Sequence, residues 1–363
     1  MELAARADDR EVVVIGGGQA GLAASYFLRR AGVDFAVLDA ASAPGGAWRH
    51  GWDSLRLFSP ARYSPLPGWW MPEQPGEEFP TAGHVADYLA AYERRYALPV
   101  LRPVRVRQLR GGAERLAVDT DRGTWRPRAV ISATGTRGAP HRPHHPGLER
   151  FTGRVLHSAD YRSPAEFRGQ RVLVIGGGNS AAQILAELSA VADTTWATRR
   201  PPRFMPDDVD GRVLFDLATA RHAARRAGLP DTGGPAALGD IVVVPPVRAA
   251  RERGALRAEP MPERFTERGA VWSDGSERPF DAVLQATGFR PDLPHLAPLL
   301  RPGADGRITT EGTRSLQDPR VHLLGYGDWT GWASATVVGA ARTAKTAVAE
   351  VTALLREDRA QTR

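Results

Sequence analysis

Two glycine-rich stretches carry the residues whose spacing points most directly to chemistry. Residues 16–21 read Gly-Gly-Gly-Gln-Ala-Gly after the apolar run Val12–Ile15, and residues 176–181 read Gly-Gly-Gly-Asn-Ser-Ala after Val172–Ile175. We call them the first and the second glycine turn. A buried strand that turns through such glycines into a helix is typical of units that hold the diphosphate of a dinucleotide on the free amides of the helix N-terminus. One such pattern is weak evidence, but its repetition predicts two dinucleotide-binding units.

The residue at the end of the next strand distinguishes the two units by its charge. Asp39 and Arg199 stand at the same offset from Gly16 and Gly176, and Arg200 follows Arg199. A carboxylate accepts hydrogen bonds from a ribose diol and repels a 2′-phosphate, whereas a guanidinium suits that phosphate. The sequence therefore predicts FAD in the first unit and NADP(H) rather than NAD(H) in the second. The alternative is that these charged residues are ordinary solvated surface groups.

Composition narrows the class of protein. Of the 363 residues, 42% are hydrophobic and 25% are charged, as in an ordinary soluble globular protein. Residues 1–11 lack the apolar core of a signal peptide, so we expect a cytoplasmic location. The sequence has no cysteine, which excludes disulfides, Cys-ligated zinc, iron–sulfur clusters and a redox-active dithiol. The net charge of +7 comes from scattered arginines and favours anionic cofactors, so we expect neither nucleic acid nor membrane as a partner.

Three histidines invite a metal interpretation. His141, His144 and His145 stand among prolines in residues 140–147. Prolines splay the neighbouring side chains, and no carboxylate or fourth ligand is spaced to complete a metal-binding set. We therefore predict that the protein has no metal site.

The other segments alternate between strand-like and helix-like patterns. Strands are expected at 34–39, 129–135, 196–198, 241–244, 281–289 and 321–329, hairpins at 100–124, and helices after each glycine turn and at 84–96, 213–227 and 335–355. Pro245 and Pro246 are expected to stop the strand at 241–244. The predicted fold is α/β with two Rossmann-like domains. An FAD-binding domain of residues 1–160 and 281–363 is split by an inserted NADPH-binding domain of residues 161–280.

A third pattern lies between the two glycine turns. Phe151, Gly153, His157 and Tyr161 form the motif F-x-G-x-x-x-H-x-x-x-Y. With this motif between two glycine turns, the chain resembles the flavin-containing monooxygenases, which are single-component class B enzymes. Residues 53–60 and 325–331 look closest to the compact bacterial branch, which includes monooxygenases of arsenic-resistance operons. Baeyer–Villiger relatives usually end the motif with Trp or Phe and Pro, so Tyr161 resembles the heteroatom-oxidising branch.

This resemblance implies an activity. FAD and NADPH would be the cofactors, with O₂ and a small molecule as further reactants. NADPH would reduce the flavin, and a flavin peroxide would oxygenate a soft sulfur, nitrogen or arsenic atom. Two alternatives stay open: an NADPH oxidase or reductase that passes electrons to a quinone or protein acceptor, and an NADP(H)-sensing flavoprotein without turnover. The sequence also leaves a homodimer open.

The expected site residues follow from these patterns and from the resemblance. Those expected to bind FAD are Gly16, Gly18, Gln19, Ala20, Gly21, Asp39, Gly46, Trp48, Ala133, Thr134, Gly135, Gly327 and Asp328. Those expected to bind NADP are Gly176, Gly178, Asn179, Ser180, Ala181, Arg199, Arg200, Thr287 and Gly288. Candidates near the flavin are Arg56, Ser59 and Tyr63, and those lining the substrate pocket are Trp48, Arg56, Tyr63, Trp329 and Trp332.

Three expectations concern roles rather than contacts. Asp328 binds the ribityl chain or caps the helix that follows it. The motif that contains His157 links the two domains and does no acid–base work, as the resemblance implies. No side chain is assigned as catalytic, because the flavin carries the chemistry.

Overall fold

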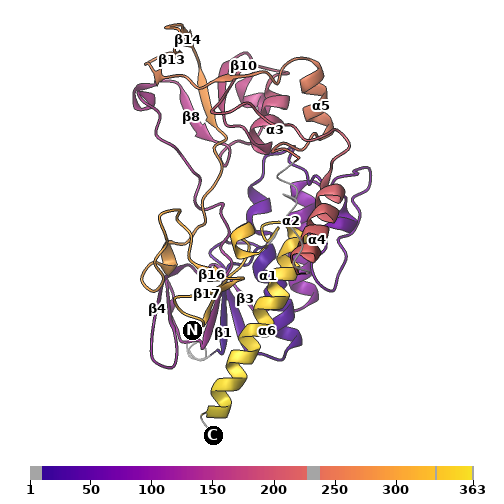
Figure 1. The fold of residues 1–363 in the computed structure, drawn as a ribbon, viewed down its shortest axis with the longest axis vertical. Coiled ribbons are helices and arrows are strands. Elements are labelled where there is room, and N and C mark those ends of the chain that lie inside the picture. The colour runs from indigo at the N-terminus through magenta and orange to yellow at the C-terminus, as the bar shows by residue number, and fades with distance from the viewer. Residues whose placement is uncertain (1–9, 227–237, 332, 362–363) are drawn as a thin grey trace. The chain divides into compact units, whose positions relative to one another are not determined.

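The computed structural model describes residues 10–226, 238–331 and 333–361. They form two compact units, each of mixed α/β architecture (Figure 1). The first unit contains the described residues of 10–49, 60–139 and 290–361, and the second contains those of 50–59 and 140–289. The predicted α/β fold with two Rossmann-like domains is confirmed. The chain passes between the units at 49/50, 59/60, 139/140 and 289/290, whereas the expected domain boundaries lie at 160/161 and 280/281.

A seven-stranded sheet forms the centre of the first unit. Its order is β16-β17-β18-β7-β1-β2-β3, and the strands from β18 to β3 are parallel. The bounds are β1 Val12–Ile15, β2 Phe35–Leu38, β3 Val100–Leu101, β7 Ala129–Ser132, β16 Thr310–Glu311, β17 Arg314–Ser315 and β18 Val321–Leu323. All residues of β1, β2 and β7 are buried, as expected for parallel strands that are covered on both faces.

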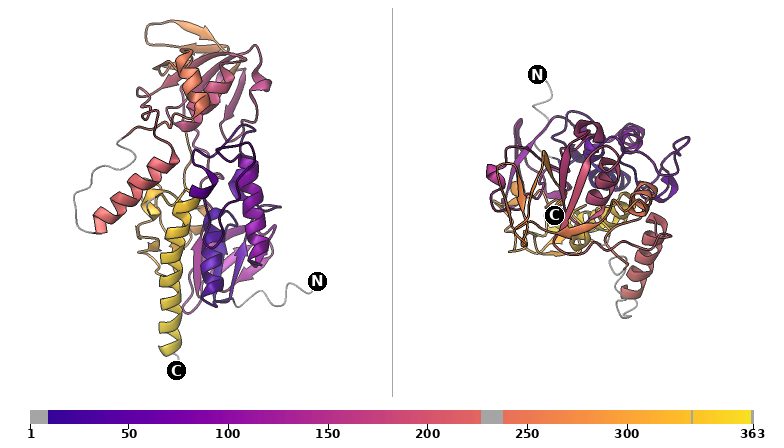
Figure 2. Two further views of the ribbon diagram at one scale, coloured as in Figure 1. Left: turned by 90° about the vertical axis from the view of Figure 1, so that its right-hand side faces the viewer. Right: turned by 90° about the horizontal axis from the view of Figure 1, so that it is seen from above.

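Three helices accompany this sheet. They are α1 (Gln19–Arg30), α2 (Ala82–Arg95) and α6 (Val337–Gln361). Thr81 caps α2, since its side-chain oxygen accepts a hydrogen bond from the His84 amide at 3.2 Å. Helix α6 packs along α1 (Figures 1 and 2). The predicted helices at 84–96 and 335–355 are therefore confirmed, with ends shifted by a few residues.

The second unit repeats the same plan. Its five parallel strands have the order β11-β10-β9-β15-β8. The bounds are β8 Arg154–His157, β9 Arg171–Ile175, β10 Asp193–Thr198, β11 Ala258–Pro260, β15 Ala282–Gln285, α3 Asn179–Leu188, α4 Gly211–Arg226 and α5 Pro245–Glu252. The three strands β15-β9-β10 correspond to β7-β1-β2 of the first unit, and a glycine turn follows the middle strand in both.

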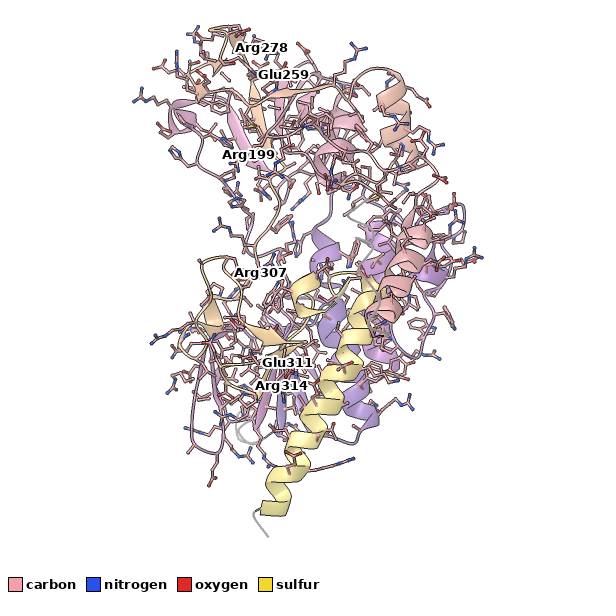
Figure 3. The ribbon with its side chains drawn as sticks, viewed as in Figure 1. Arg199, Glu259, Arg278, Arg307, Glu311 and Arg314 are labelled. Carbon is pink, nitrogen blue, oxygen red and sulfur yellow. The ribbon has the colours of Figure 1, made fainter. Side chains whose placement is uncertain are left out.

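Each unit also carries a small antiparallel sheet. In the first unit this sheet is β4 (Val106–Arg110), β5 (Ala117–Thr120) and β6 (Gly123–Trp125). In the second it is β12 (Arg264–Phe265), β13 (Gly269–Val271) and β14 (Glu277–Pro279). Arg278 of β14 pairs with Glu259 of β11, and its guanidinium lies 3.5 Å from the ring centroid of Trp272 (Figure 3). This contact fastens the small sheet to the edge of the parallel one.

One predicted element is wrong, and another is found with shifted ends. The strand expected at 241–244 is wrong: Ile241 makes one isolated bridge to Phe204, and Pro245 and Pro246 begin helix α5. Proline suits the first turn of a helix, where an amide hydrogen has no partner to lose. The helix expected at 213–227 is α4, and residue 227 lies outside the described residues.

Two classes of site find no counterpart among the described residues. No described helix combines the length and apolar character needed to cross a lipid bilayer. No group of three histidine or acidic side chains in the described part of the chain is arranged to hold a metal ion.

Two buried histidines of the first unit are held in the neutral state. The Nε2 atom of His295 lies 3.0 Å from the Ser132 hydroxyl, and Nδ1 of His322 lies 3.0 Å from the Thr313 hydroxyl. Burial lowers the pKa of each imidazole from 6.5 to about 4, and the charge of Arg314 adds to this effect at His322. Between pH 6.5 and about 4 the unfolded chain therefore binds more protons than the folded one.

We expect the free energy of unfolding to fall as the pH drops through this window. The loss is up to about 3 kcal/mol for each histidine, because the folded state gains little from protonation there. Urea unfolding at pH 7 and at pH 4.5 measures it. His322→Gln should flatten the pH dependence, whereas the same change at exposed His144 should leave it unaltered. Equal pH dependence in wild type and His322→Gln would contradict this explanation.

Candidate functional site

The first glycine turn contains glycines of two kinds. Gly16 has φ of +105°, and a Cβ there would lie 2.5 Å from the carbonyl oxygen of Ala133, the residue that follows the neighbouring strand β7. A Cβ on Gly21 would lie 1.9 Å from the Gly16 oxygen, so only glycine allows α1 to pack this close. Gly18, by contrast, has no atom within 4 Å of such a Cβ. The outer glycines are thus required by the fold, and the middle one faces open space at the start of α1.

The second glycine turn repeats this geometry. Gly176 has φ of +133°, and its Cβ would lie 2.2 Å from the carbonyl oxygen of Ala286. Gly178 again faces open space. Ala181 takes the third small position and is fully buried. The N-cap residues of α1 and α3 are Gly18 and Gly178, and neither helix has a side-chain cap. The free amides at both helix N-termini can therefore bind the diphosphate of a dinucleotide.

Two predicted contact residues use their side chains within the protein. Gln19 accepts a hydrogen bond from the Trp48 indole at 2.8 Å and donates one to the Ala335 carbonyl at 2.7 Å. Asn179 accepts from the Val242 amide at 2.8 Å and donates to the Asp240 carbonyl at 3.2 Å. A ligand would therefore meet the backbone of these residues and not their amide groups.

Arg102 is a residue that sequence reasoning missed. Its Nε lies 2.6 Å from Asp39 and its Nη1 lies 2.7 Å from Glu93, in a site where the guanidinium is only 9% exposed. Burial acts to lower the pKa of Arg102, but the bonds to Glu93 and Asp39 outweigh it and raise the pKa. Arg102 therefore stays charged and fixes the Asp39 carboxylate. Its Nη2 has no hydrogen-bond partner among the described residues and would lie 2.6 Å from a Cβ on Gly17.

A cavity of about 460 Å³ lies at this end of the first sheet. Asp39, Arg105, Thr134 and Asp292 are among the residues that line it. The Thr134 hydroxyl donates to the Asp292 carbonyl at 2.7 Å, which holds the end of β7 in place. Burial raises the pKa of the Asp292 carboxyl, although the nearby charge of Arg105 opposes this shift.

The other predicted FAD contacts lie on loops of the first unit. A Cβ on Gly46 would lie 2.9 Å from Gly18 Cα, so this loop packs directly on the first glycine turn. The Asp328 carboxylate accepts a hydrogen bond from the Ala333 amide at 3.2 Å. It thus closes the turn that precedes α6, but the expected cap of α6 is instead Thr336, whose hydroxyl accepts a hydrogen bond from the Gly339 amide at 3.0 Å. The remaining predicted positions here are Ala20, Ala133, Gly135 and Gly327, which belong to α1 and to the loops after β7 and β18.

A second cavity, of about 560 Å³, lies in the second unit. The second glycine turn lines it together with Arg199, Arg200, Thr287 and Gly288. Both arginines are exposed, and neither has an ion-pair partner among the residues that the structure describes (Figure 3 labels Arg199). The one acid that lines the cavity, Asp240, pairs with Arg203 at 2.7 Å. Six of the nine predicted NADP residues therefore line one cationic cavity, and the other three, Asn179, Ser180 and Ala181, lie in the first turn of α3.

The residues expected near the flavin fall into different units. Arg56 and Ser59 belong to the second unit, whereas Tyr63 belongs to the first. Of the expected pocket residues, Trp48 and Trp329 lie in the first unit. Trp332 lies outside the described residues.

Segment 50–59 joins the second unit through the end of the motif. Tyr161 donates a hydrogen bond to Glu187 at 2.6 Å, and Ser54 donates to the other carboxylate oxygen. Burial raises the pKa of both Tyr161 and Glu187, and the two hydrogen bonds partly oppose the shift at Glu187. The Asp53 amide donates to the Arg162 carbonyl at 2.9 Å. No periodicity in residues 50–59 could have revealed this attachment.

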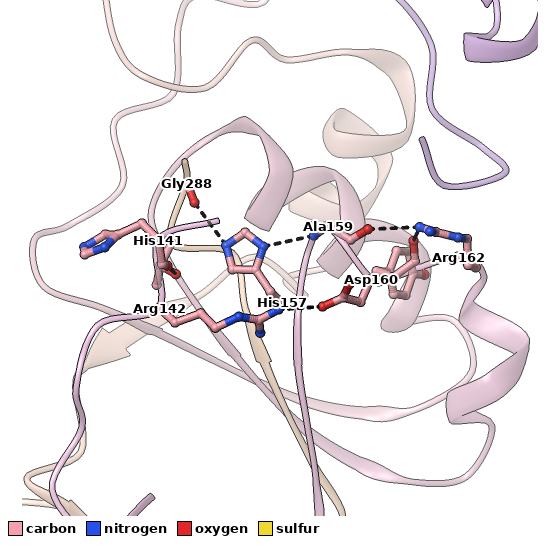
Figure 4. Close-up of polar contacts among 9 residues, drawn as sticks. His141, Arg142, His157, Ala159, Asp160, Arg162 and Gly288 are labelled. Atoms are coloured by element: carbon pink, nitrogen blue, oxygen red, sulfur yellow. Dashed lines mark hydrogen bonds and ion pairs between the residues drawn. The ribbon is translucent and has the colours of Figure 1, made fainter. Parts of the chain in front are cut away.

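The rest of the motif organises the end of β8 (Figure 4). His157 is fully buried; its Nδ1 accepts from the Ala159 amide at 3.0 Å, so its Nε2–H donates to the Gly288 carbonyl at 3.0 Å. Gly153 is required because a Cβ there would lie 2.6 Å from the Asp281 carbonyl oxygen, while Phe151 packs in the core. Both ring nitrogens of His157 are thus engaged with the backbone, beside the point where the chain leaves the second unit.

Comparisons with known proteins agree with this geometry. Residues 13–214 match the pyridine nucleotide-disulphide oxidoreductase family. A flavin-containing monooxygenase from Stenotrophomonas maltophilia is 52% identical, with a TM-score of 0.87 over 96% of this chain and 99% of that one. An uncharacterized CzcO-like oxidoreductase of Geobacillus kaustophilus is 30% identical over 78% of this chain and 81% of its own length. The indole-3-pyruvate monooxygenase YUCCA1 of Oryza sativa is 28% identical over 78% of this chain and 77% of its own.

The chain therefore belongs to the pyridine nucleotide-disulphide oxidoreductase family, in its flavin-containing monooxygenase branch. It is an oxidoreductase, a flavin-dependent monooxygenase, and enzymes of this type use FAD and NADPH. Both glycine turns fit these cofactors, since each leaves open space in front of an uncapped helix N-terminus.

Matched glycine substitutions should separate binding from folding. We expect Gly178→Ala to keep the wild-type unfolding temperature but to weaken NADP⁺ binding about tenfold, because the added methyl occupies space that the diphosphate would fill. Gly18→Ala should weaken FAD retention in the same way. Gly176→Ala and Gly16→Ala should lower the unfolding temperature, since the methyl meets a strand carbonyl. Calorimetry and thermal unfolding measure both effects, and normal cofactor binding by the Gly18 and Gly178 variants would refute the assignment.

Proposed function

We propose that the protein is an NADPH-dependent FAD monooxygenase that transfers one oxygen atom of O₂ to a soft sulfur, nitrogen or arsenic atom of a small molecule. In this proposal the first unit binds FAD and the second unit binds NADPH. The observation that carries it is the contrast between equivalent positions of the two units: a fixed carboxylate at Asp39, and at Arg199 a guanidinium that has no ion-pair partner among the described residues.

The first unit suits a nucleotide without a 2′-phosphate. Arg102 holds the Asp39 carboxylate close to the first glycine turn, with its oxygens ready to accept hydrogen bonds from a ribose diol. Glu93 pairs with the same guanidinium, so the group of three charges is negative overall. A phosphate placed there would be repelled, which favours FAD over NADPH in this unit.

The second unit suits a nucleotide that carries a 2′-phosphate. Arg199 and Arg200 follow β10 directly and line the same cavity as the second glycine turn. A guanidinium without an acidic partner can pair with a phosphate at no loss of an existing ion pair. We therefore infer a preference for NADPH over NADH.

The chain's own residues would bind and orient the two nucleotides. The flavin, when bound, supplies the redox chemistry and the reaction with O₂. Tyr161 at the end of the motif supports heteroatom oxidation over Baeyer–Villiger chemistry, as the family resemblance implies. The absence of cysteine from the 363 residues removes any dithiol relay, so electrons from NADPH have no disulfide to reduce in this chain. A cytoplasmic location and a homodimer stay predictions.

Removal of the positive charges that follow β10 tests the inferred preference for NADPH over NADH. We expect Arg199→Ala to raise the Kd for NADPH by about tenfold or more and to leave the Kd for NADH within a factor of about two, because only NADPH carries the phosphate. The double variant with Arg200→Ala should lose the preference for NADPH. Stopped-flow reduction of the flavin at several coenzyme concentrations measures both constants. An equal rise in Kd for NADPH and for NADH would show that the arginines do not recognise the 2′-phosphate.

Product analysis tests the reaction. With NADPH, O₂ and a panel of thioethers, tertiary amines and trivalent arsenicals, we expect at least one substrate to yield an oxygenated product in proportion to NADPH consumed. Hydrogen peroxide should form when the substrate is omitted. Stoichiometric hydrogen peroxide with every substrate, or rapid electron transfer to a quinone, would instead identify an oxidase or reductase.

A further inference from the structure

Residues 140–147, the histidine segment, are fastened at both ends within the second unit. At one end the His141 amide donates to the Gly288 carbonyl at 2.9 Å, and the Thr287 hydroxyl donates to the His141 carbonyl at 2.5 Å. At the other end the Phe265 amide donates to the Pro146 carbonyl at 2.7 Å. Both anchors fix the backbone, so the position of each histidine on this segment is set by the fold.

This segment forms one wall of the cationic cavity. His141, Pro143 and His145 line the cavity together with Arg199 and Arg200, whereas His144 does not line it. The wall carries no acidic side chain, and the Asp240 carboxylate is paired with Arg203. An anion that entered the cavity would therefore meet donors from β10 and from the histidine segment.

His145 has the features of an unfilled binding group. Its side chain is only 7% exposed and packs beside Phe265, with the ring centroids 6.0 Å apart. Its Nε2 is buried and has no hydrogen-bond partner among the described residues. Since Nε2 is sealed, Nδ1 is the one ring nitrogen with which His145 can bind a group in the cavity.

The charge state of the ring agrees with a donor role. Burial, followed by the charges of Arg199 and His144, lowers the pKa of His145, so the ring is neutral at pH 7. A proton on the sealed Nε2 would find no acceptor there, whereas a proton on Nδ1 can be donated into the cavity. Arg199 and His145 line the same cavity.

We propose that His145 determines coenzyme specificity by donating a hydrogen bond from Nδ1 to the 2′-phosphate that Arg199 and Arg200 bind. This inference rests on the proposed function, because it assumes that the second unit binds NADPH. It assigns a role to a residue that the metal interpretation of the sequence left without one. His145 would recognise the phosphate through one hydrogen bond from a neutral ring whose position is fixed by the fold. The two arginines would supply the positive charge that attracts the phosphate.

The test uses two fragments of the coenzyme, adenosine 2′,5′-bisphosphate and 5′-AMP, titrated into the FAD-loaded protein by calorimetry. The ratio of their affinities isolates the 2′-phosphate. We expect His145→Phe, which keeps an aromatic ring against Phe265, to reduce this ratio about tenfold. His145→Asn should restore it to within about threefold of wild type, because its amide nitrogen can take the place of Nδ1. His144→Phe, the same change on the neighbouring residue, should leave the ratio unaltered.

The outcomes separate this inference from the proposed function. If Arg199→Ala reduces the ratio but His145→Phe does not, His145 has no part in phosphate recognition. If neither variant changes the ratio, the phosphate site itself is misplaced and the proposed function fails with it. If His145→Phe weakens both fragments equally, the ring serves packing or adenosine binding, which also overturns the proposal. Thermal unfolding of each variant confirms that it is folded before titration.

Discussion

The close approach of a glycine to a strand carbonyl is the constraint on which both units depend. Gly16 and Gly176 lie so near the carbonyl oxygens of Ala133 and Ala286 that no side chain fits between them. This approach lets each helix begin directly over the ends of two parallel strands. The middle glycine of each turn is then left facing empty space, at the point where a helix N-terminus attracts an anion. Folding and nucleotide binding therefore share one backbone geometry.

The charge of the residue that follows β2 in the first unit and β10 in the second gives the two similar units different nucleotide preferences. In the first unit Asp39 is locked into a buried cluster with Arg102 and Glu93. In the second unit Arg199 faces the cavity with no acid among the described residues to neutralise it. The backbone scaffold is repeated, and the charge at one position per unit decides which nucleotide it suits.

Local patterns predicted the elements well but their partners less well. The glycine turns, the strand after each, and helices α2 and α6 followed from glycine spacing and from apolar periodicity. Strand 281–289 was assigned to the first domain, yet β15 pairs with β9, as β7 pairs with β1. The repeat of the strand, glycine turn and helix pattern in the sequence already indicated that the two pairings would correspond. The attachments of Gln19, Asn179 and Arg102 depend on residues distant in sequence, and no spacing rule predicts such pairings.

The path of the chain between the units has a consequence for biosynthesis. Every strand of the second unit lies between residues 154 and 285, and its added segment 50–59 precedes them. The first unit, by contrast, pairs β7 with β18, and α1 with α6 near the end of the chain. On the ribosome the second unit can thus complete its sheet while the first still lacks an edge and a covering helix. The half-built first sheet would be the species most in need of chaperone protection during translation.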